Sequence, residues 1–93
     1  MRKIIFFHGA DCPHCQKMMP LVKELEKELK IKVEKLEVWY NDKNAEKMRK
    51  YEDIIGEAGN GDLGVPAFVD EKNNEALCGE MSKSELKKWL ISK

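Results

Sequence analysis

The chain has 93 residues, enough for one compact domain with a single hydrophobic core. Apolar residues make up 42% and charged residues 37%, which is typical of a water-soluble globular protein and excludes a disordered tail. Seventeen basic and seventeen acidic side chains give a net charge of zero, which argues against a surface built to bind nucleic acid. The longest apolar run, residues 4–7, is too short to cross a membrane, and we expect no secretory leader. We therefore expect a cytoplasmic protein.

The first third of the chain predicts a strand followed by a helix. Residues 2–7 form a short apolar run with two aromatic side chains, and Gly9 follows as a turn signal. Proline is favoured at the first helical position, so Cys12 and Pro13 are expected to open a helix. Over residues 15–29, apolar side chains recur every three or four positions, which predicts one buried stripe.

The rest of the chain predicts three more strands and two more helices. The expected elements are a strand at 32–40, a helix at 44–55, a glycine-rich loop at 56–64, strands at 65–69 and 75–78 joined by a turn at 72–75, and a helix opened by a capping box at 82–85. A strand–helix–strand start implies a parallel pair, and the later hairpin adds an antiparallel edge. The sequence thus predicts a single α/β domain over residues 1–93. Its order is β-α-β-α-β-β-α, with one mixed four-stranded sheet flanked by three helices.

The main candidate for chemistry is Cys12-Pro13-His14-Cys15, at the joint between the first strand and its helix. Unpaired amides and the helix dipole favour an anion there, so we expect a lowered pKa for the Cys12 thiol. Pro13 sets the helix start, and a protonated His14 would lower that pKa further. Cys15 lies one turn into the helix on the buried stripe, so it should be less exposed and have a higher pKa. This asymmetry predicts that Cys12 attacks a disulfide and that Cys15 resolves the mixed disulfide.

A pair of cysteines at this spacing also fits half of a zinc or iron–sulfur site. Zinc would need two more ligands, and the available ones are His8, His14, Cys78 and carboxylates. His14 lies inside the loop that it would have to ligate, so we favour redox exchange. That reaction needs no metal or organic cofactor, because the dithiol is itself the redox centre. The alternative is a non-enzymatic metal- or cluster-binding module. We interpret Cys78 as a small buried residue and His8 as a polar loop residue without a catalytic role.

The motif and its surroundings resemble the thioredoxin superfamily along nearly the whole chain. Residues 7–29, with Cys-x-x-Cys and a proline eight residues after Cys12, resemble the active-site strand and helix of that family. Val65-Pro66 resembles the strand that opens with a cis-proline facing the cysteines. The C-terminal segments that resemble the family ending are 72–75, 78–83 and 86–90. The short start, the Cys-Pro-x-Cys pattern and Val-Pro are similar to glutaredoxins.

The resemblance implies a thioredoxin-like fold and a thiol–disulfide oxidoreductase that acts in electron transport and cell redox homeostasis. Carried over by position, Cys12 would be the nucleophile, Cys15 the resolving thiol and Pro66 the cis-proline. Val65 would offer its backbone to an extended substrate. The implied partners are protein disulfides, with a reductase or glutathione as the electron donor. We expect a monomer that binds neither nucleic acid nor a membrane.

Overall fold

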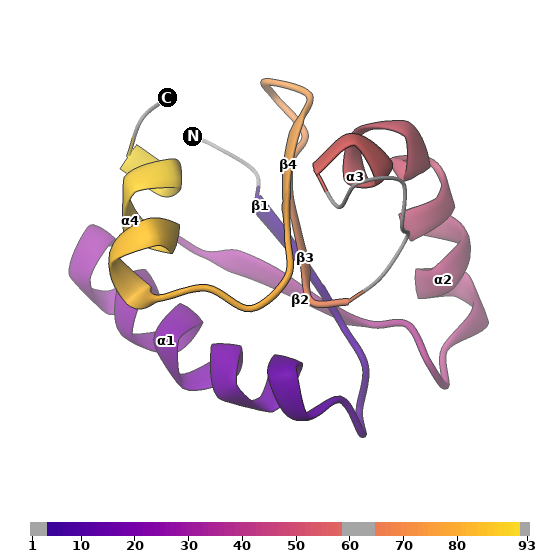
Figure 1. Ribbon diagram of the computed structural model, residues 1–93, viewed down its shortest axis with the longest axis horizontal. Coiled ribbons are helices and arrows are strands. Elements are labelled where there is room, and N and C mark those ends of the chain that lie inside the picture. The colour runs from indigo at the N-terminus through magenta and orange to yellow at the C-terminus, as the bar shows by residue number, and fades with distance from the viewer. Residues whose placement is uncertain (1–3, 59–64, 92–93) are drawn as a thin grey trace.

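The computed structural model describes residues 4–58 and 65–91. In chain order its elements are β1 (Ile4–His8), α1 (Pro13–Leu29), β2 (Val33–Glu37), α2 (Asp42–Arg49), α3 (Glu52–Ala58), β3 (Ala67–Asp70), β4 (Glu75–Cys78) and α4 (Lys83–Ile91). The strands form one sheet, with α1 and α4 on one side and α2 and α3 on the other (Figure 1). The α/β class and the mixed four-stranded sheet are therefore as the sequence predicted.

The strand order in the sheet is β2-β1-β3-β4. β1 pairs with β2 in parallel, and β3 pairs antiparallel with both β1 and β4. Phe6 lies opposite Phe68 in the register, and their rings stack with centroids 4.6 Å apart. Because β1 leads directly into the loop before α1, the centre of the sheet fixes where the two cysteines of the motif lie.

Alternation along β1 divides the core into two layers. Ile4 and Phe6 face α1 and α4, where they pack with the apolar stripe of α1. Ile5 and Phe7 face the other side and pack against residues of α2 and α3. All four side chains are fully buried, which makes β1 apolar on both faces and explains its uninterrupted apolar run.

The single helix expected at 44–55 is two helices, so the prediction of three flanking helices was wrong and four are described. The chain tightens at Lys50 and Tyr51, whose amides donate to carbonyls only three residues back, at Lys47 and Met48. The tighter turn directs the Tyr51 ring toward Phe7, with centroids 6.3 Å apart. The side-chain period alone could not show this, because the apolar residues on either side keep helical spacing.

Other boundaries also differ from the sequence prediction, and the strand expected at 65–69 is β3 (Ala67–Asp70). The second strand ends at Glu37 rather than Tyr40, because the Glu37 carboxylate accepts the amides of Trp39 and Tyr40 and turns the chain. The helix α3 continues through Gly56 to Ala58, so the expected loop begins later. The remainder of that loop, residues 59–64, lies outside the described residues, as do residues 2–3 of the expected first strand.

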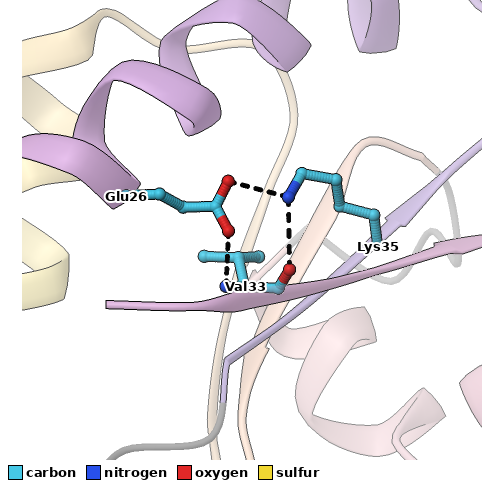
Figure 2. A network of polar contacts seen from close by, with 3 residues as sticks. All are labelled: Glu26, Val33 and Lys35. Atoms are coloured by element: carbon cyan, nitrogen blue, oxygen red, sulfur yellow. Dashed lines mark hydrogen bonds and ion pairs between the residues drawn. The ribbon is translucent and has the colours of Figure 1, made fainter. Parts of the chain in front are cut away.

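The far end of α1 is fastened to β2 by the carboxylate of Glu26 (Figure 2). One carboxylate oxygen accepts the Val33 amide at 2.9 Å, and the other accepts the Lys35 ammonium at 2.8 Å. Partial burial alone would raise the pKa of Glu26, but the bonds from Lys35 and Val33 outweigh it and hold that pKa below its usual value. The network therefore joins helix and strand with a charged, hydrogen-bonded contact.

Candidate active site

Cys12 is the N-cap of α1, immediately before Pro13 at the first helical position. Its backbone is extended, with φ −82° and ψ 112°, and its amide donates to the Gly9 carbonyl at 3.1 Å. The Cys15 amide donates to the Cys12 sulfur at 3.2 Å. That sulfur takes the place of the side-chain oxygen of a usual N-cap, and a donated N–H stabilises sulfur best when it is a thiolate.

Cys15 lies on the buried stripe of α1, as the sequence predicted. Both thiols are free, with Cys12 4% exposed and Cys15 1% exposed. Burial is the main cause that raises the pKa of Cys15 to about 12, and its hydrogen bond to Cys12 adds to this, while the Gly9 amide opposes it. The difference in exposure between the two thiols is therefore small, while the pKa of Cys15 is raised as expected.

Val65 and Pro66 lie where β3 begins, beside the end of β1. Phe7 pairs with Ala67, so the residues just before β3 face the loop that leads to Cys12. The Val65–Pro66 peptide bond is cis, and the Pro66 carbonyl accepts the Gly79 amide at 2.8 Å. Val65 packs against the core cluster that contains both Cys12 and Cys15. The structure thus brings these four sequence-predicted residues into one region.

His14 is exposed, and its described partner is a residue that the sequence reasoning did not select. Nδ1 of His14 lies 2.7 Å from a carboxylate oxygen of Glu80, in the segment between β4 and α4. The hydrogen bond from His14 is the main cause that lowers the pKa of Glu80. This contact ties the first turn of α1 to the far side of the hairpin, across 66 positions of sequence.

Glu37 is a second residue that the sequence reasoning missed. One oxygen of its carboxylate accepts the amides of Ala10 and Trp39 at 2.9 Å each, and the other accepts the Tyr40 amide at 2.8 Å. The carboxylate therefore joins the loop before Cys12 to the turn after β2. An acidic residue at a strand end carries no sequence signal for this role, since the donors to its carboxylate are backbone amides that every residue except proline has.

Two aromatic side chains cover the same loop. A Cβ on Gly9 would lie 2.3 Å from a ring carbon of Trp39, so only glycine fits beneath that ring. The Tyr40 hydroxyl donates to the Asp11 carboxylate, which raises the pKa of Tyr40. Trp39 is 50% exposed and Tyr40 72% exposed, so both lie at the surface beside the motif rather than within the sheet.

A pocket of about 440 Å³ opens between the end of β1 and the first half of α1. The residues that line it are His8, Gly9, Ala10, Cys15, Gln16, Met19, Pro20 and Lys23. Neither Val65 nor Pro66 lines it, so it lies apart from the groove that the resemblance implied for a substrate. His8 ends β1 instead of lying in a loop, which corrects the sequence-based interpretation of its position.

No group of three or more His, Cys, Asp or Glu side chains within residues 4–58 and 65–91 is arranged to hold a metal ion. None of the described helices is long and apolar enough to cross a membrane.

Comparison with solved structures finds 51 similar chains, among them the following two. A glutaredoxin from Archaeoglobus fulgidus superimposes with a TM-score of 0.68 at 17% identity, covering 98% of this chain and 88% of the other. A thioredoxin-like protein from Clostridium perfringens superimposes with a TM-score of 0.72 at 24% identity, covering 99% of this chain and 70% of the other. No protein-family model matches the sequence, and a search of curated proteins finds no match. The chain therefore has the thioredoxin-like fold that its motifs implied.

Proposed function

We propose that this protein is a thiol–disulfide oxidoreductase in which Cys12 and Cys15 alternate between dithiol and disulfide. The observation that carries the proposal is the position of Cys12 as the N-cap of α1, with its sulfur accepting the Cys15 amide at 3.2 Å. Backbone donors and the helix dipole favour a thiolate at that position, and the thiolate is the attacking species in disulfide exchange.

The reaction has two exchange steps. The Cys12 thiolate attacks one sulfur of a substrate disulfide, whose other sulfur leaves as a thiolate and takes up a proton. The resulting mixed disulfide joins Cys12 to the substrate. Cys15 then loses its proton and attacks the Cys12 sulfur, which forms the Cys12–Cys15 disulfide and releases the second substrate thiolate. The substrate is reduced by two electrons and the protein is oxidised by two.

Protein disulfides in extended segments are the proposed substrates. Val65 lies two residues before the first residue of β3 and beside the motif, where its backbone can pair with an extended segment. A reductase or glutathione would return the protein to its dithiol form. The direction of electron flow depends on the reduction potential of the pair, so that potential is a necessary measurement.

Trapping of the mixed disulfide tests the assigned roles. Cys15→Ser leaves the nucleophile in place and removes the resolving thiol, so it should accumulate a covalent adduct with a disulfide-containing peptide. Cys12→Ser should form no adduct and should show no turnover. Non-reducing gel electrophoresis and mass spectrometry would measure both. Adducts on Cys12→Ser instead of Cys15→Ser would reverse the roles, and adducts on neither would contradict the proposed function.

Equilibration of the wild-type protein against glutathione gives the potential. A value at or below about −250 mV would indicate a cytosolic reductase, and a value near about −120 to −180 mV would indicate a disulfide donor or isomerase. The absence of a reversible two-electron couple would contradict both. Cys78→Ser is the matched control, since Cys78 belongs to β4 and should leave the couple unchanged.

A further inference from the structure

The second exchange step requires Cys15 to release a proton from a buried position. Burial and the hydrogen bond to Cys12 together raise the pKa of Cys15 to about 12. In the mixed disulfide the Cys12 sulfur carries no charge, but the largest cause, burial, remains. At neutral pH only a very small fraction of such a thiol is ionised. A nearby base would therefore accelerate the step that resolves the mixed disulfide.

His8 lies on the same side of the sheet as Cys15. Alternation along β1 places His8 with Ile4 and Phe6, on the face covered by α1, and its ring lies 5.3 Å from the Phe6 ring between centroids. His8 and Cys15 both line the pocket of about 440 Å³. Gly9, the residue after His8, also lines this pocket, so Cys15 lies near the end of β1.

The pocket also provides a route for a proton. A space of about 440 Å³ holds several water molecules, and a histidine ring, an amide side chain and backbone groups line it. Of its lining residues, Lys23 is an ammonium at neutral pH and Gln16 has no basic nitrogen. His8 is the lining residue that is both uncharged and basic under those conditions.

The groups that face His8 set its charge state. Burial lowers the pKa of His8, Glu37 on β2 raises it, and Lys35 on β2 lowers it further, with a net lowering. Lys23 of α1 adds positive charge across the pocket. The imidazole is therefore neutral at pH 7 and able to take up a proton, and the Glu37 carboxylate favours the imidazolium that then forms.

We propose, on the basis of the proposed function, that His8 accepts the proton of Cys15 during resolution of the mixed disulfide, through water in the pocket that both residues line. The Cys15 S–H bond breaks as the proton passes to the His8 imidazole. The Cys15 thiolate then attacks the Cys12 sulfur, and the bond between Cys12 and the substrate sulfur breaks. The substrate leaves as a thiolate, and the imidazolium returns its proton to that thiolate or to solvent.

A stopped-flow experiment with 5,5′-dithiobis(2-nitrobenzoate) separates the two exchange steps. The first aryl thiolate is released when Cys12 attacks, at a rate proportional to reagent concentration. The second is released when Cys15 attacks, at a rate independent of reagent. General bases contribute about 10²–10⁴-fold, so His8→Asn should slow the second release about 100-fold at pH 7 and leave the first unchanged. Added imidazole should restore part of the second rate.

The pH dependence of the second release rate distinguishes proton transfer to His8 from a purely structural role of that residue. In the wild type, the second rate should rise with pH and level off above the pKa of His8, below the ordinary histidine value. In His8→Asn it should rise in proportion to hydroxide with no such plateau. Lys23→Gln is the matched control, because it alters the same pocket without removing a neutral base. It should keep the plateau, with the inflection at a slightly higher pH because a positive charge facing His8 is lost.

The outcomes separate this inference from the proposed function. Release of only one aryl thiolate by the wild type would overturn the proposed function and this inference with it. Two releases with unchanged kinetics in His8→Asn would overturn only the role of His8. If His8→Asn does not fold, the wild-type protein provides a second test. The pH at which its second release rate levels off can be compared with the pKa of His8 measured by nuclear magnetic resonance. A mismatch between those two values would also overturn the assignment.

Discussion

Two glutamates fasten the opposite ends of β2, and their surroundings differ. Glu26 is partly buried and holds both a backbone amide at Val33 and the Lys35 ammonium (Figure 2). Glu37 is also partly buried, but its hydrogen bonds are exposed and come only from backbone amides, one of them at Ala10 in the loop before the motif. The first contact links helix to strand in a partly desolvated setting, where charged hydrogen bonds contribute to stability. The second contact fixes a loop, and its effect should appear in the chemistry of Cys12.

The largest effect is expected from Gly9→Ala, in the loop before Cys12. This change should affect stability and reactivity together, and so remove the contrast between the two contacts. The new Cβ would lie 2.3 Å from the Trp39 ring, so the ring or the loop must move. Overpacking of this kind costs about 1–3 kcal/mol of unfolding free energy, and displacement of the loop should also slow attack by Cys12. Urea denaturation and the first-release rate would measure the two effects.

The double variant Gly9→Ala with Trp39→Ala is the control for that steric explanation. Removal of the ring gives the new methyl group space, so the double variant should recover most of the loss relative to Trp39→Ala alone. An equal loss in both backgrounds would show that Trp39 is not the cause.

An intermediate effect, confined to stability, is expected from Glu26→Gln. Loss of the charged bonds to Lys35 and Val33 should lower the unfolding free energy by about 1–2 kcal/mol and leave exchange rates unchanged. The folded-state pKa of Glu26 is below its unfolded value, so its contribution is present above the unfolded pKa and is lost as pH falls through the folded pKa. Denaturation midpoints between pH 7 and pH 3 should therefore converge for the variant and the wild type. A constant difference across that range would contradict the ionic explanation.

The smallest effect on stability is expected from Glu37→Gln. This variant tests whether the Glu37 contact acts on the loop before Cys12 and not on stability, as the Glu26 contact does. The amide keeps one acceptor oxygen but replaces the other with an NH₂ group that cannot accept the loop amides. We expect little change in the denaturation midpoint, a modest slowing of the first release, and faster hydrogen exchange at the Ala10 amide. A large loss of stability with an unchanged first-release rate would show that Glu37 acts as Glu26 does.

The sequence was most informative where a local rule decides the structure. Pro13 after Cys12 predicted the helix start, and the capping box at Ser82 and Glu85 predicted the last helix, where the Glu85 amide donates to the Ser82 hydroxyl at 3.2 Å. Asn74 has φ 52° in the predicted hairpin turn, a conformation that asparagine tolerates. These features depend on residues a few positions apart, so the sequence pattern alone is enough to predict them.

The features that the sequence did not predict depend on long-range contacts. The break between α2 and α3 places Tyr51 against Phe7, which no helical period can indicate. Glu80 meets His14 across 66 positions, and Glu37 meets Ala10 across 27. The pocket shared by His8 and Cys15 exists only once β1 and α1 are packed together. Positions of the cysteines followed from the motif, whereas the groups that surround them required the tertiary structure.

Val65 packs against both layers of the core, the one beneath α1 and α4 and the one beneath α2 and α3. It also precedes Pro66, where an extended segment is proposed to bind. A partner that binds at this residue therefore requires both helical layers to be packed. Binding and global unfolding are then thermodynamically linked, so the affinity of a bound peptide can be read as a rise in the melting temperature of the whole domain.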